Sequence, residues 1–211
     1  MTLIPEVMKK ILILGIAFLL TAAAAAAQGT DFHRKYRNFS WSQNTMASGG
    51  DKQKSELGFA FTSGRTYFLH GKPIAGMLKV GIDATWADIN YTKYEDIRLG
   101  EDGPADAYWH QLEYSLQVGP SVALNPVGKL NVNAYFRYAP TFSLRYSAKP
   151  DAALSGNYAT LFVTGGMVSW GIIGIGAEYR FGSCSYRNFI GESASPADMS
   201  GFRAFITLRF K

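Results

Sequence analysis

The sequence predicts an all-β protein, an antiparallel up-and-down barrel of about eight strands. Long stretches alternate apolar and polar residues with a period of two, which indicates extended strands with one apolar and one polar face. Helical spacing fits none of these stretches. The segments between them are rich in Gly, Pro, Asp and Ser, as turns require, and are short and long in alternation. One meandering sheet produces this order.

The chain begins with the layout of a secretory signal peptide. Lys9 and Lys10 form a positive region, Ile11–Leu20 an apolar region, and Ala25-Ala26-Ala27 a small-residue cleavage site. A permanent transmembrane helix is the alternative, because the apolar run nearly reaches spanning length. The alanine-rich end and the polar chain after it favour cleavage. We therefore expect residues 1–27 to be a signal peptide and residues 28–211 to form one barrel domain.

Charge and cysteine content exclude other classes of protein. The formal net charge is +5, and the charged residues are dispersed apart from one short cluster at His33–Arg37. A nucleic-acid partner would require a basic stripe on a recognisable module, and the sequence has neither. Cys184 is the only cysteine, so an exported form has no intramolecular disulfide.

Five segments carry the clearest alternation. In the longest, Leu130–Tyr146, residues such as Val132 and Phe136 share one face, while Asn131 and Arg137 share the other. This segment is about three times as long as an ordinary strand. The five segments are Leu78–Trp86, Leu112–Leu124, Leu130–Tyr146, Ile173–Phe181 and Phe202–Phe210.

Three weaker segments, Tyr36–Met46, Ser55–Leu69 and Tyr158–Trp170, bring the number of strands to eight. In the second of them Arg65 falls on the apolar face, which either a bulge at Ser63-Gly64 or snorkelling of the side chain would explain. Pro120 and Pro140 also fall on the apolar face. Because proline removes a ladder donor, we expect local bulges there.

The connecting segments alternate in length. Tight turns are expected at Gly71-Lys72-Pro73, Asn125–Gly128 and Trp170–Ile172. Longer polar links are expected at Ala47–Lys54, Glu95–Ala107, Ser147–Asn157 and Phe189–Ser200.

Alternation alone does not say which face meets water. An inward apolar face gives a soluble, lipocalin-like cup, and an outward one gives a transmembrane barrel. The strands are at least as long as the roughly nine to eleven tilted residues that cross a bilayer. Aromatic residues gather near the ends of the apolar face, as at headgroup depth: Trp86, Tyr108, Tyr146, Tyr179 and Phe181 toward the long links, and Phe210 at the other end. These observations favour the transmembrane barrel.

The last residues, GFRAFITLRF, resemble the C-terminal insertion signal of bacterial outer-membrane proteins. The apolar residues of this signal are Phe202, Ala204, Ile206, Leu208 and Phe210, although Lys211 makes Phe210 penultimate. With the signal peptide and eight strands, the chain resembles the small outer-membrane barrels of the OmpA/OmpX type. The resemblance implies export to the outer membrane of a Gram-negative cell envelope, contact with its lipids and lipopolysaccharide, and insertion by the barrel-insertion machinery. It also implies a role in membrane integrity or surface adhesion.

Six charged residues lie mid-strand on the polar face: Asp83, Glu113, Arg137, Glu178, Arg180 and Arg203. An eight-stranded barrel is just wide enough for side chains to fill, so these charges would have to pair with one another. We expect them to form an ion-pair plug. A transport or gating role is the alternative.

The sequence predicts no catalytic, cofactor or metal site. The three histidines, His33, His70 and His110, are separated by the meander. A lipid-hydrolysing site of His110 with Glu113 and Ser115 is disfavoured, because the histidine has the opposite parity to the other two. Glu95-Asp96 and Glu101-Asp102 are expected to be solvated charge.

We therefore expect a non-enzymatic barrel that acts at the cell surface through its long loops, toward a ligand the sequence does not identify. The alternatives are a soluble periplasmic barrel that binds an apolar ligand and an outer-membrane lipid-modifying enzyme.

Overall fold

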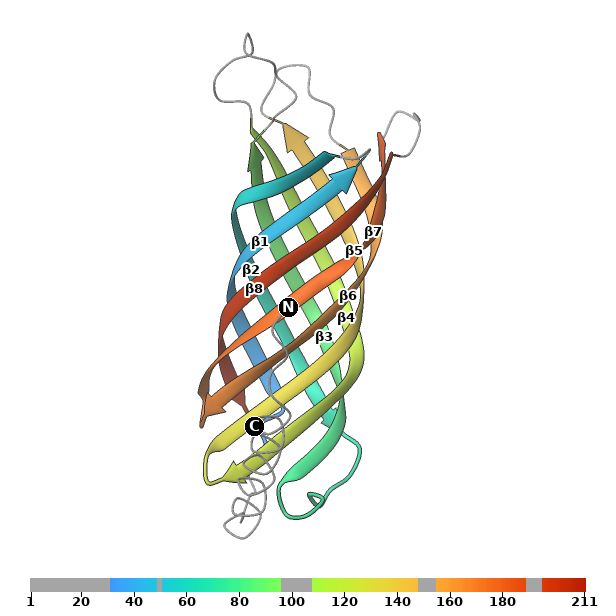
Figure 1. Ribbon diagram of the computed structural model, residues 1–211. Coiled ribbons are helices and arrows are strands. Elements are labelled where there is room, and N and C mark those ends of the chain that lie inside the picture. Colours follow the sequence, from blue (N-terminus) through green and yellow to red (C-terminus); the bar gives the residue numbers. More distant parts are fainter. Residues whose placement is uncertain (1–30, 49–50, 96–107, 148–154, 189–194) are drawn as a thin grey trace, which may run out of the picture.

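The computed structural model describes residues 31–48, 51–95, 108–147, 155–188 and 195–211. These residues form eight antiparallel strands that close into one barrel (Figure 1). Each strand pairs with its neighbours in the sequence, and the last pairs with the first. The strands are β1 (Lys35–Ser48), β2 (Asp51–Phe68), β3 (Leu78–Glu95), β4 (Tyr108–Val127), β5 (Leu130–Ser147), β6 (Ser155–Trp170), β7 (Ile173–Asn188) and β8 (Ser195–Phe210).

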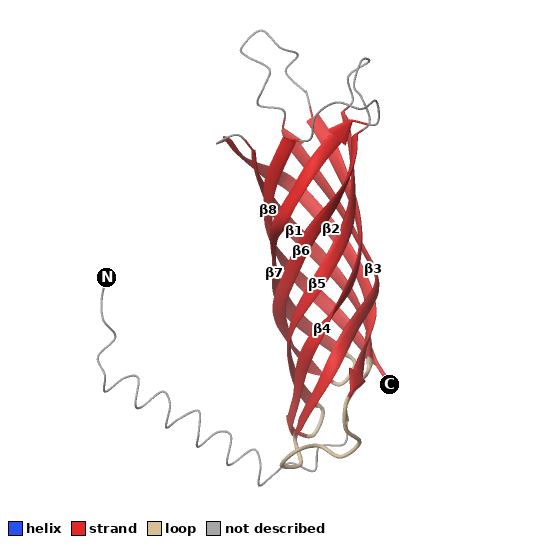
Figure 2. Cartoon of the chain, turned by 90° about the vertical axis from the view of Figure 1, so that its right-hand side faces the viewer, coloured by secondary structure: helices blue, strands red, loops and turns tan. Residues whose placement is uncertain are grey.

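The fold class predicted from the alternation is confirmed: the barrel is all-β and up-and-down. Within the described ranges, no helix is long and apolar enough to cross a membrane. The strands tilt strongly around the barrel axis (Figure 2). The tilt follows from the stagger of the strand register. A path that starts at Lys35 of β1 and follows paired residues once around the barrel, first to Arg65 of β2, returns to β1 at Thr45 instead of at Lys35.

The two ends of the barrel differ. The end that holds Lys35, Phe210 and the connections β2–β3, β4–β5 and β6–β7 is called the turn end. The opposite end is the loop end. The predicted link Ala47–Lys54 is wrong, because β1 runs to Ser48, β2 starts at Asp51 and those two residues pair. The β2–β3 connection is longer than predicted, since residues 69–77 separate the strands.

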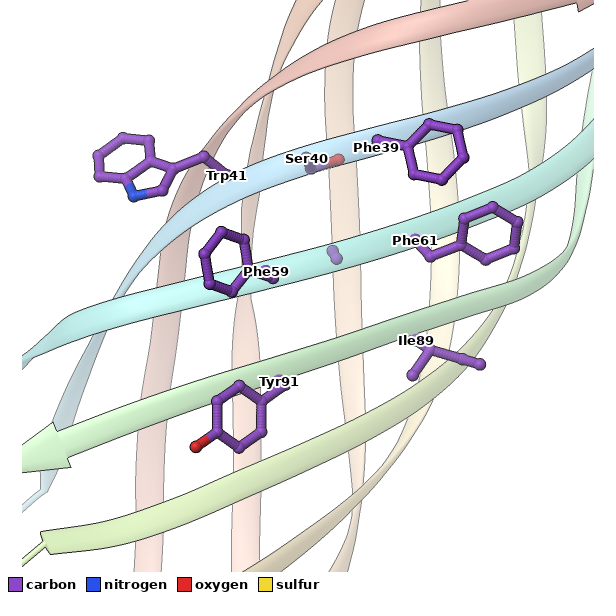
Figure 3. A pocket seen from close by; sticks show the side chains of 8 residues that line it. Phe39, Ser40, Trp41, Phe59, Phe61, Ile89 and Tyr91 are labelled. Atoms are coloured by element: carbon purple, nitrogen blue, oxygen red, sulfur yellow. The ribbon is translucent and has the colours of Figure 1, made fainter.

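The apolar face of the sheet is the outer face. Phe59 and Ile175 are 54% and 68% exposed, whereas Arg137 is 1% exposed. Figure 3 shows the pattern on three neighbouring strands: Phe39 and Trp41 of β1, Phe59 and Phe61 of β2, and Ile89 and Tyr91 of β3 project from the ribbon around a shallow hollow on the outer surface. An outward apolar face is the surface of a transmembrane barrel, and a soluble cup would have the reverse.

One bulge changes which residues enter the barrel. The pairing of β3 with β4 shifts between Thr85 and Asp88, so Trp86 and Ala87 lie opposite a single residue of β4. Beyond this bulge, Asp88 is buried in the interior, although the alternation of the first half of β3 predicts that it faces outward. Trp86 also lies nearer the turn end than predicted, since it lines a hollow with Lys35 and Phe210.

Other irregularities were predicted in part. Arg65 lies on the outer face, with its guanidinium 5.3 Å from the Tyr67 ring centroid, so it extends along the surface rather than turning inward. The register of β2 with β3 also shifts between Ser63 and Gly64, where the other explanation put a bulge, but the extra residue belongs to β3. The bulges expected at Pro120 and Pro140 are absent from the described strands: the register runs through both prolines without a shift. The register of β4 and β5 has no paired residues between Val118 and Ser121, the gap in which Pro120 lies.

Candidate functional site

The barrel interior brings the six predicted charged residues together, with one addition. Arg137 contacts Asp83 at 2.7 Å, and Arg180 contacts Glu113 at 2.9 Å. Arg203 bridges Asp88 at 2.8 Å and Glu178 at 3.0 Å. We call these seven residues the ion-pair cluster: Asp83, Asp88, Glu113, Arg137, Glu178, Arg180 and Arg203.

Strand parity positions each of these side chains. Asp83 and Arg137 lie on the inward parity of β3 and β5, and Glu178 and Arg180 stand two residues apart on β7, so both project into the lumen. Pairing of β7 with β8 sets Glu178 directly beside Arg203. Asp88 joins them only because of the β3 bulge, which lies opposite Ser63 and Gly64 of β2.

Neutral polar side chains complete the hydrogen bonding of the carboxylates. Glu113 accepts from Asn90 at 2.7 Å and from Gln111 at 3.0 Å. Asp88 accepts from Ser115 at 2.9 Å and from Gln117 at 2.6 Å, and the amide oxygen of Gln117 accepts from Arg137 at 3.1 Å. Buried charge is tolerated only with such pairing, because desolvation costs several kcal/mol per ion. Gln117 thus connects the Asp83–Arg137 pair to the group of Asp88, Arg203 and Glu178, while Arg180 and Glu113 form a second pair with polar partners of its own.

The ion-pair cluster contains three guanidinium groups and four carboxylates, a formal charge of −1. The next cation toward the turn end is Arg209, which is 2% exposed and donates to the carbonyl oxygen of His33 at 2.9 Å. Tyr36 lies between Arg209 and the ion-pair cluster. Its ring centroid is 5.2 Å from the guanidinium group of Arg137 and 5.7 Å from that of Arg209. The positive charge of Arg209 thus offsets the excess negative charge.

An apolar cluster that the alternation did not predict occupies part of the interior toward the loop end, beside buried polar side chains such as Asn44 and Gln111. At its edge the rings of Tyr94 and Trp109 stack 4.3 Å apart, and the guanidinium of Arg145 lies 3.8 Å from the Trp109 ring centroid. Inward Leu161 and Val163 were not predicted because Gly165-Gly166 blurs the parity of β6, and their outward neighbours Thr160, Phe162 and Thr164 mix polar and apolar residues. We call this set the apolar cap: Met46, Tyr94, Tyr135, Ala139, Ala159, Leu161, Val163, Cys184, Ala197 and Met199, with Trp109 packed against it.

The histidine site considered from the sequence does not assemble. His110 lies toward the outer face, where its Nδ1 is 2.8 Å from the Tyr91 hydroxyl and the two rings stack. Glu113 and Ser115 are buried in the interior, bound to Arg180 and Asp88. His70 is in the β2–β3 connection, and His33 lies 3.5 Å from Asp31 at the turn end.

Metal ligands do not gather in the described part of the chain: no group of three or more His, Cys, Asp or Glu residues is placed to hold an ion. Of the other predicted long links, residues 96–107, 148–154 and 189–194 lie outside the described residues, and with them Asp96 and the pair Glu101-Asp102. Residues 155–157 and 195–200, predicted as parts of links, belong to β6 and β8 instead.

The residues of the predicted insertion signal all lie on the outer parity of β8. Phe202, Ile206 and Phe210 are exposed, and β8 pairs with β1 from Lys35 to Ala47. The final residue, Lys211, contacts Asp31 at 3.4 Å. The five residues of the motif are Phe202, Ala204, Ile206, Leu208 and Phe210.

Comparison with protein-family models gives no match, and comparison with curated proteins gives none either. Solved structures do match. The attachment invasion locus protein Ail of Yersinia pestis, crystallised with the heparin analogue sucrose octasulfate, aligns with a TM-score of 0.50 and 11% identity over 85% of this chain and 100% of Ail.

Neisserial surface protein A gives a TM-score of 0.48 and 13% identity over 83% of this chain and 97% of that protein. The outer-membrane protease OmpT of Escherichia coli gives a TM-score of 0.44 and 9% identity over 86% and 98%. The chain therefore has the fold of small outer-membrane β-barrels. At these identities the likeness extends to the fold alone.

Proposed function

We propose that the protein is a non-enzymatic barrel of the outer membrane, closed to solutes, which acts as a rigid membrane anchor for its loops at the cell surface. One observation carries the proposal. The interior is filled by side chains, with the ion-pair cluster in the middle and, toward the loop end, the apolar cap beside hydrogen-bonded polar residues such as Asn44 and Gln111. A water-filled pore requires a hydrated lumen, which the apolar cap opposes.

The outer surface supports a membrane location. Large apolar side chains such as Phe59, Ile175 and Trp170 are more than half exposed, a surface that water would not tolerate over so wide an area. On this proposal residues 1–27 direct export, outer-membrane lipids and lipopolysaccharide surround the barrel, and the insertion machinery recognises the end of β8. The loop end then faces the cell exterior, where a surface ligand would bind.

The experiment has two parts. Cells expressing the protein are fractionated, and the purified protein is added to planar bilayers beside a general porin. We expect extraction from the outer membrane by detergent alone, and no conductance steps above the bare bilayer. Extraction in aqueous buffer would favour the soluble periplasmic barrel with an apolar ligand instead. Porin-like steps would refute a closed lumen.

The lipid-modifying alternative is tested separately. Lipid A from cells that overexpress the protein is compared by mass spectrometry with lipid A from cells that carry His110→Ala. We expect identical spectra. A change in acyl chains that depends on His110 would show an enzyme and overturn the non-enzymatic proposal.

A further inference from the structure

Three cations meet on the outer face of the barrel at its turn end. Lys35 is the first residue of β1 and pairs with Arg65 of β2 on one side and with Phe210 of β8 on the other. Arg37 lies two residues along β1 on the same face as Lys35. The three positive charges therefore occupy neighbouring positions on two adjacent strands.

These cations surround a hollow of about 520 Å³ in the outer surface, which we call the basic hollow. Aromatic side chains form the rest of its wall. The Tyr67 and Trp86 rings lie edge to face with centroids 6.4 Å apart, and Phe210 borders the hollow on the β8 side. The side chains that line it on the outer face are Lys35, Arg37, Arg65, Tyr67, Trp86 and Phe210, beside Ser63.

The positive charge of the basic hollow is not neutralised within the described part of the protein. No carboxylate lines the hollow, and Lys35, Arg37 and Arg65 form no ion pair with a described residue. Arg37 and Arg65 contact aromatic rings instead, at 5.9 and 5.3 Å from the centroids. The Nε of Arg65 is shielded from solvent and has no hydrogen-bond acceptor.

Several cations elsewhere in the described part of the protein have carboxylate partners, although others, such as Lys79 and Arg209, contact aromatic rings or a carbonyl oxygen instead. Inside the barrel, each arginine of the ion-pair cluster has a carboxylate within 3.0 Å. On the outer face toward the loop end, Lys93 lies 3.6 Å from Glu56. Beside the hollow, the carboxylate of Asp31 contacts Lys211 and His33. What distinguishes the basic hollow is that three cations with no carboxylate partner among the described residues line one cavity, so an anion would complete the site.

We propose that the basic hollow binds the phosphate of an anionic phospholipid in the leaflet that surrounds the turn end. This inference rests on the proposed membrane location. Guanidinium groups suit phosphate oxygens because they donate two parallel hydrogen bonds, and the lysine adds a compact third charge. Trp86 and Tyr67 fit the boundary between headgroup and acyl chains, where aromatic rings with one polar edge gather.

The position of the hollow favours a lipid over a free phosphate ion. It opens sideways from the strands onto the surface that faces the bilayer, and its aromatic wall would contact the glycerol and the first acyl carbons. A soluble anion would use only the cations. Basic pockets at the membrane boundary recognise lipid headgroups in the same way, through clustered Lys and Arg near the end of the membrane-spanning part.

Native mass spectrometry of the full chain in detergent tests the proposal, with phosphatidylglycerol and phosphatidylcholine as alternative probes at equal concentration. We expect the wild type to retain one phosphatidylglycerol in preference to phosphatidylcholine. Arg37→Gln with Arg65→Gln should lower the retained fraction about tenfold or more, since two charge-assisted contacts to phosphate are lost. Lys93→Gln is the matched control, an outer-face cation at the loop end, and should retain the lipid as the wild type does.

Heat-modifiable migration on gels confirms that each variant is folded before its spectrum is recorded. Equal retention by the double variant, or equal retention of the two lipids by the wild type, would overturn the proposal. Displacement of phosphatidylglycerol by millimolar inorganic phosphate would also overturn it, because the site would then bind free anions. A protein that fractionates as soluble would instead refute the membrane location on which the inference rests.

Discussion

Replacing Arg203 by methionine removes the most connected cation of the ion-pair cluster. Its side chain is 0% exposed and its Nη1 contacts both Asp88 and Glu178. Methionine is similar in length but leaves two buried carboxylates without their cation. Removing one partner of a buried pair costs about 3–5 kcal/mol. Asp88 keeps its bonds from Ser115 and Gln117, which limits the loss on that side.

Arg180→Met is the matched comparison. Arg180 contacts a single carboxylate, Glu113, which keeps its bonds from Asn90 and Gln111. We expect Arg180→Met to lower the free energy of unfolding by about half as much as Arg203→Met, because it leaves one buried carboxylate without its cation instead of two. Adding Asp88→Asn to Arg203→Met should restore about 1–3 kcal/mol, since one unpaired charge disappears.

The assay is urea unfolding of the barrel in phosphatidylcholine vesicles, followed by tryptophan fluorescence and by heat-modifiable migration. The free energy of unfolding should fall in the order wild type, Arg180→Met, Arg203→Met. An Arg203→Met barrel as stable as the wild type would mean that water already solvates the interior charges. The argument for a closed lumen would then be wrong as well.

Three further predictions concern the two faces and the two ends of the barrel. Phe136→Arg puts a charge on the outer face in the middle of β5 and should cost about 2–4 kcal/mol in the same unfolding assay, whereas equal stability would show that this face does not meet lipid. Protease added to intact cells should leave Lys72 and Lys129 uncut, since both lie in connections at the turn end, and cleavage there would reverse the proposed orientation. Deletion of Phe210 together with Lys211 should sharply reduce the heat-modifiable fraction in membranes, whereas deletion of Lys211 alone should be tolerated. Accumulation of the double deletion as folded soluble protein would contradict the proposed membrane location.

Much of the barrel could be predicted from the sequence because burial in this fold follows parity. Residues two apart share a face, so Leu130–Tyr146 alone reveals which residues enter the lumen and which face outward. The same rule brought Asp83, Arg137 and Arg203 into one set before any geometry was known. This set could be predicted without knowing which residues pair across strands. An eight-stranded barrel is narrow enough that inward side chains from the middle of each strand meet in its centre.

Parity fails where the backbone or the composition interrupts it. The bulge at Trp86 and Ala87 exchanges the faces of the second half of β3, so Asp88 enters the lumen although it continues the outward parity of Leu78–Trp86. The bulged residues of β3 include no glycine, and the glycine that marks the position is Gly64 of the neighbouring strand. On β6, Gly165-Gly166 and the mixed outward neighbours Thr160, Phe162 and Thr164 blur the parity, so the sequence did not show that Leu161 and Val163 enter the lumen.

The β3 bulge also links the two sites of the protein. Before the bulge, β3 follows the predicted parity, with Asp83 inward beside Arg137 and Ile82 outward. At the bulge, Trp86 remains outward and lines the basic hollow with Arg65, while Asp88 turns inward to Arg203. A strand without the extra residue could present Trp86 to the lipid or Asp88 to the lumen, but not both, because they are an even number of residues apart. The extra residue in β3, opposite the shift at Ser63 and Gly64, is therefore what allows one strand to serve both the ion-pair cluster and the proposed lipid site.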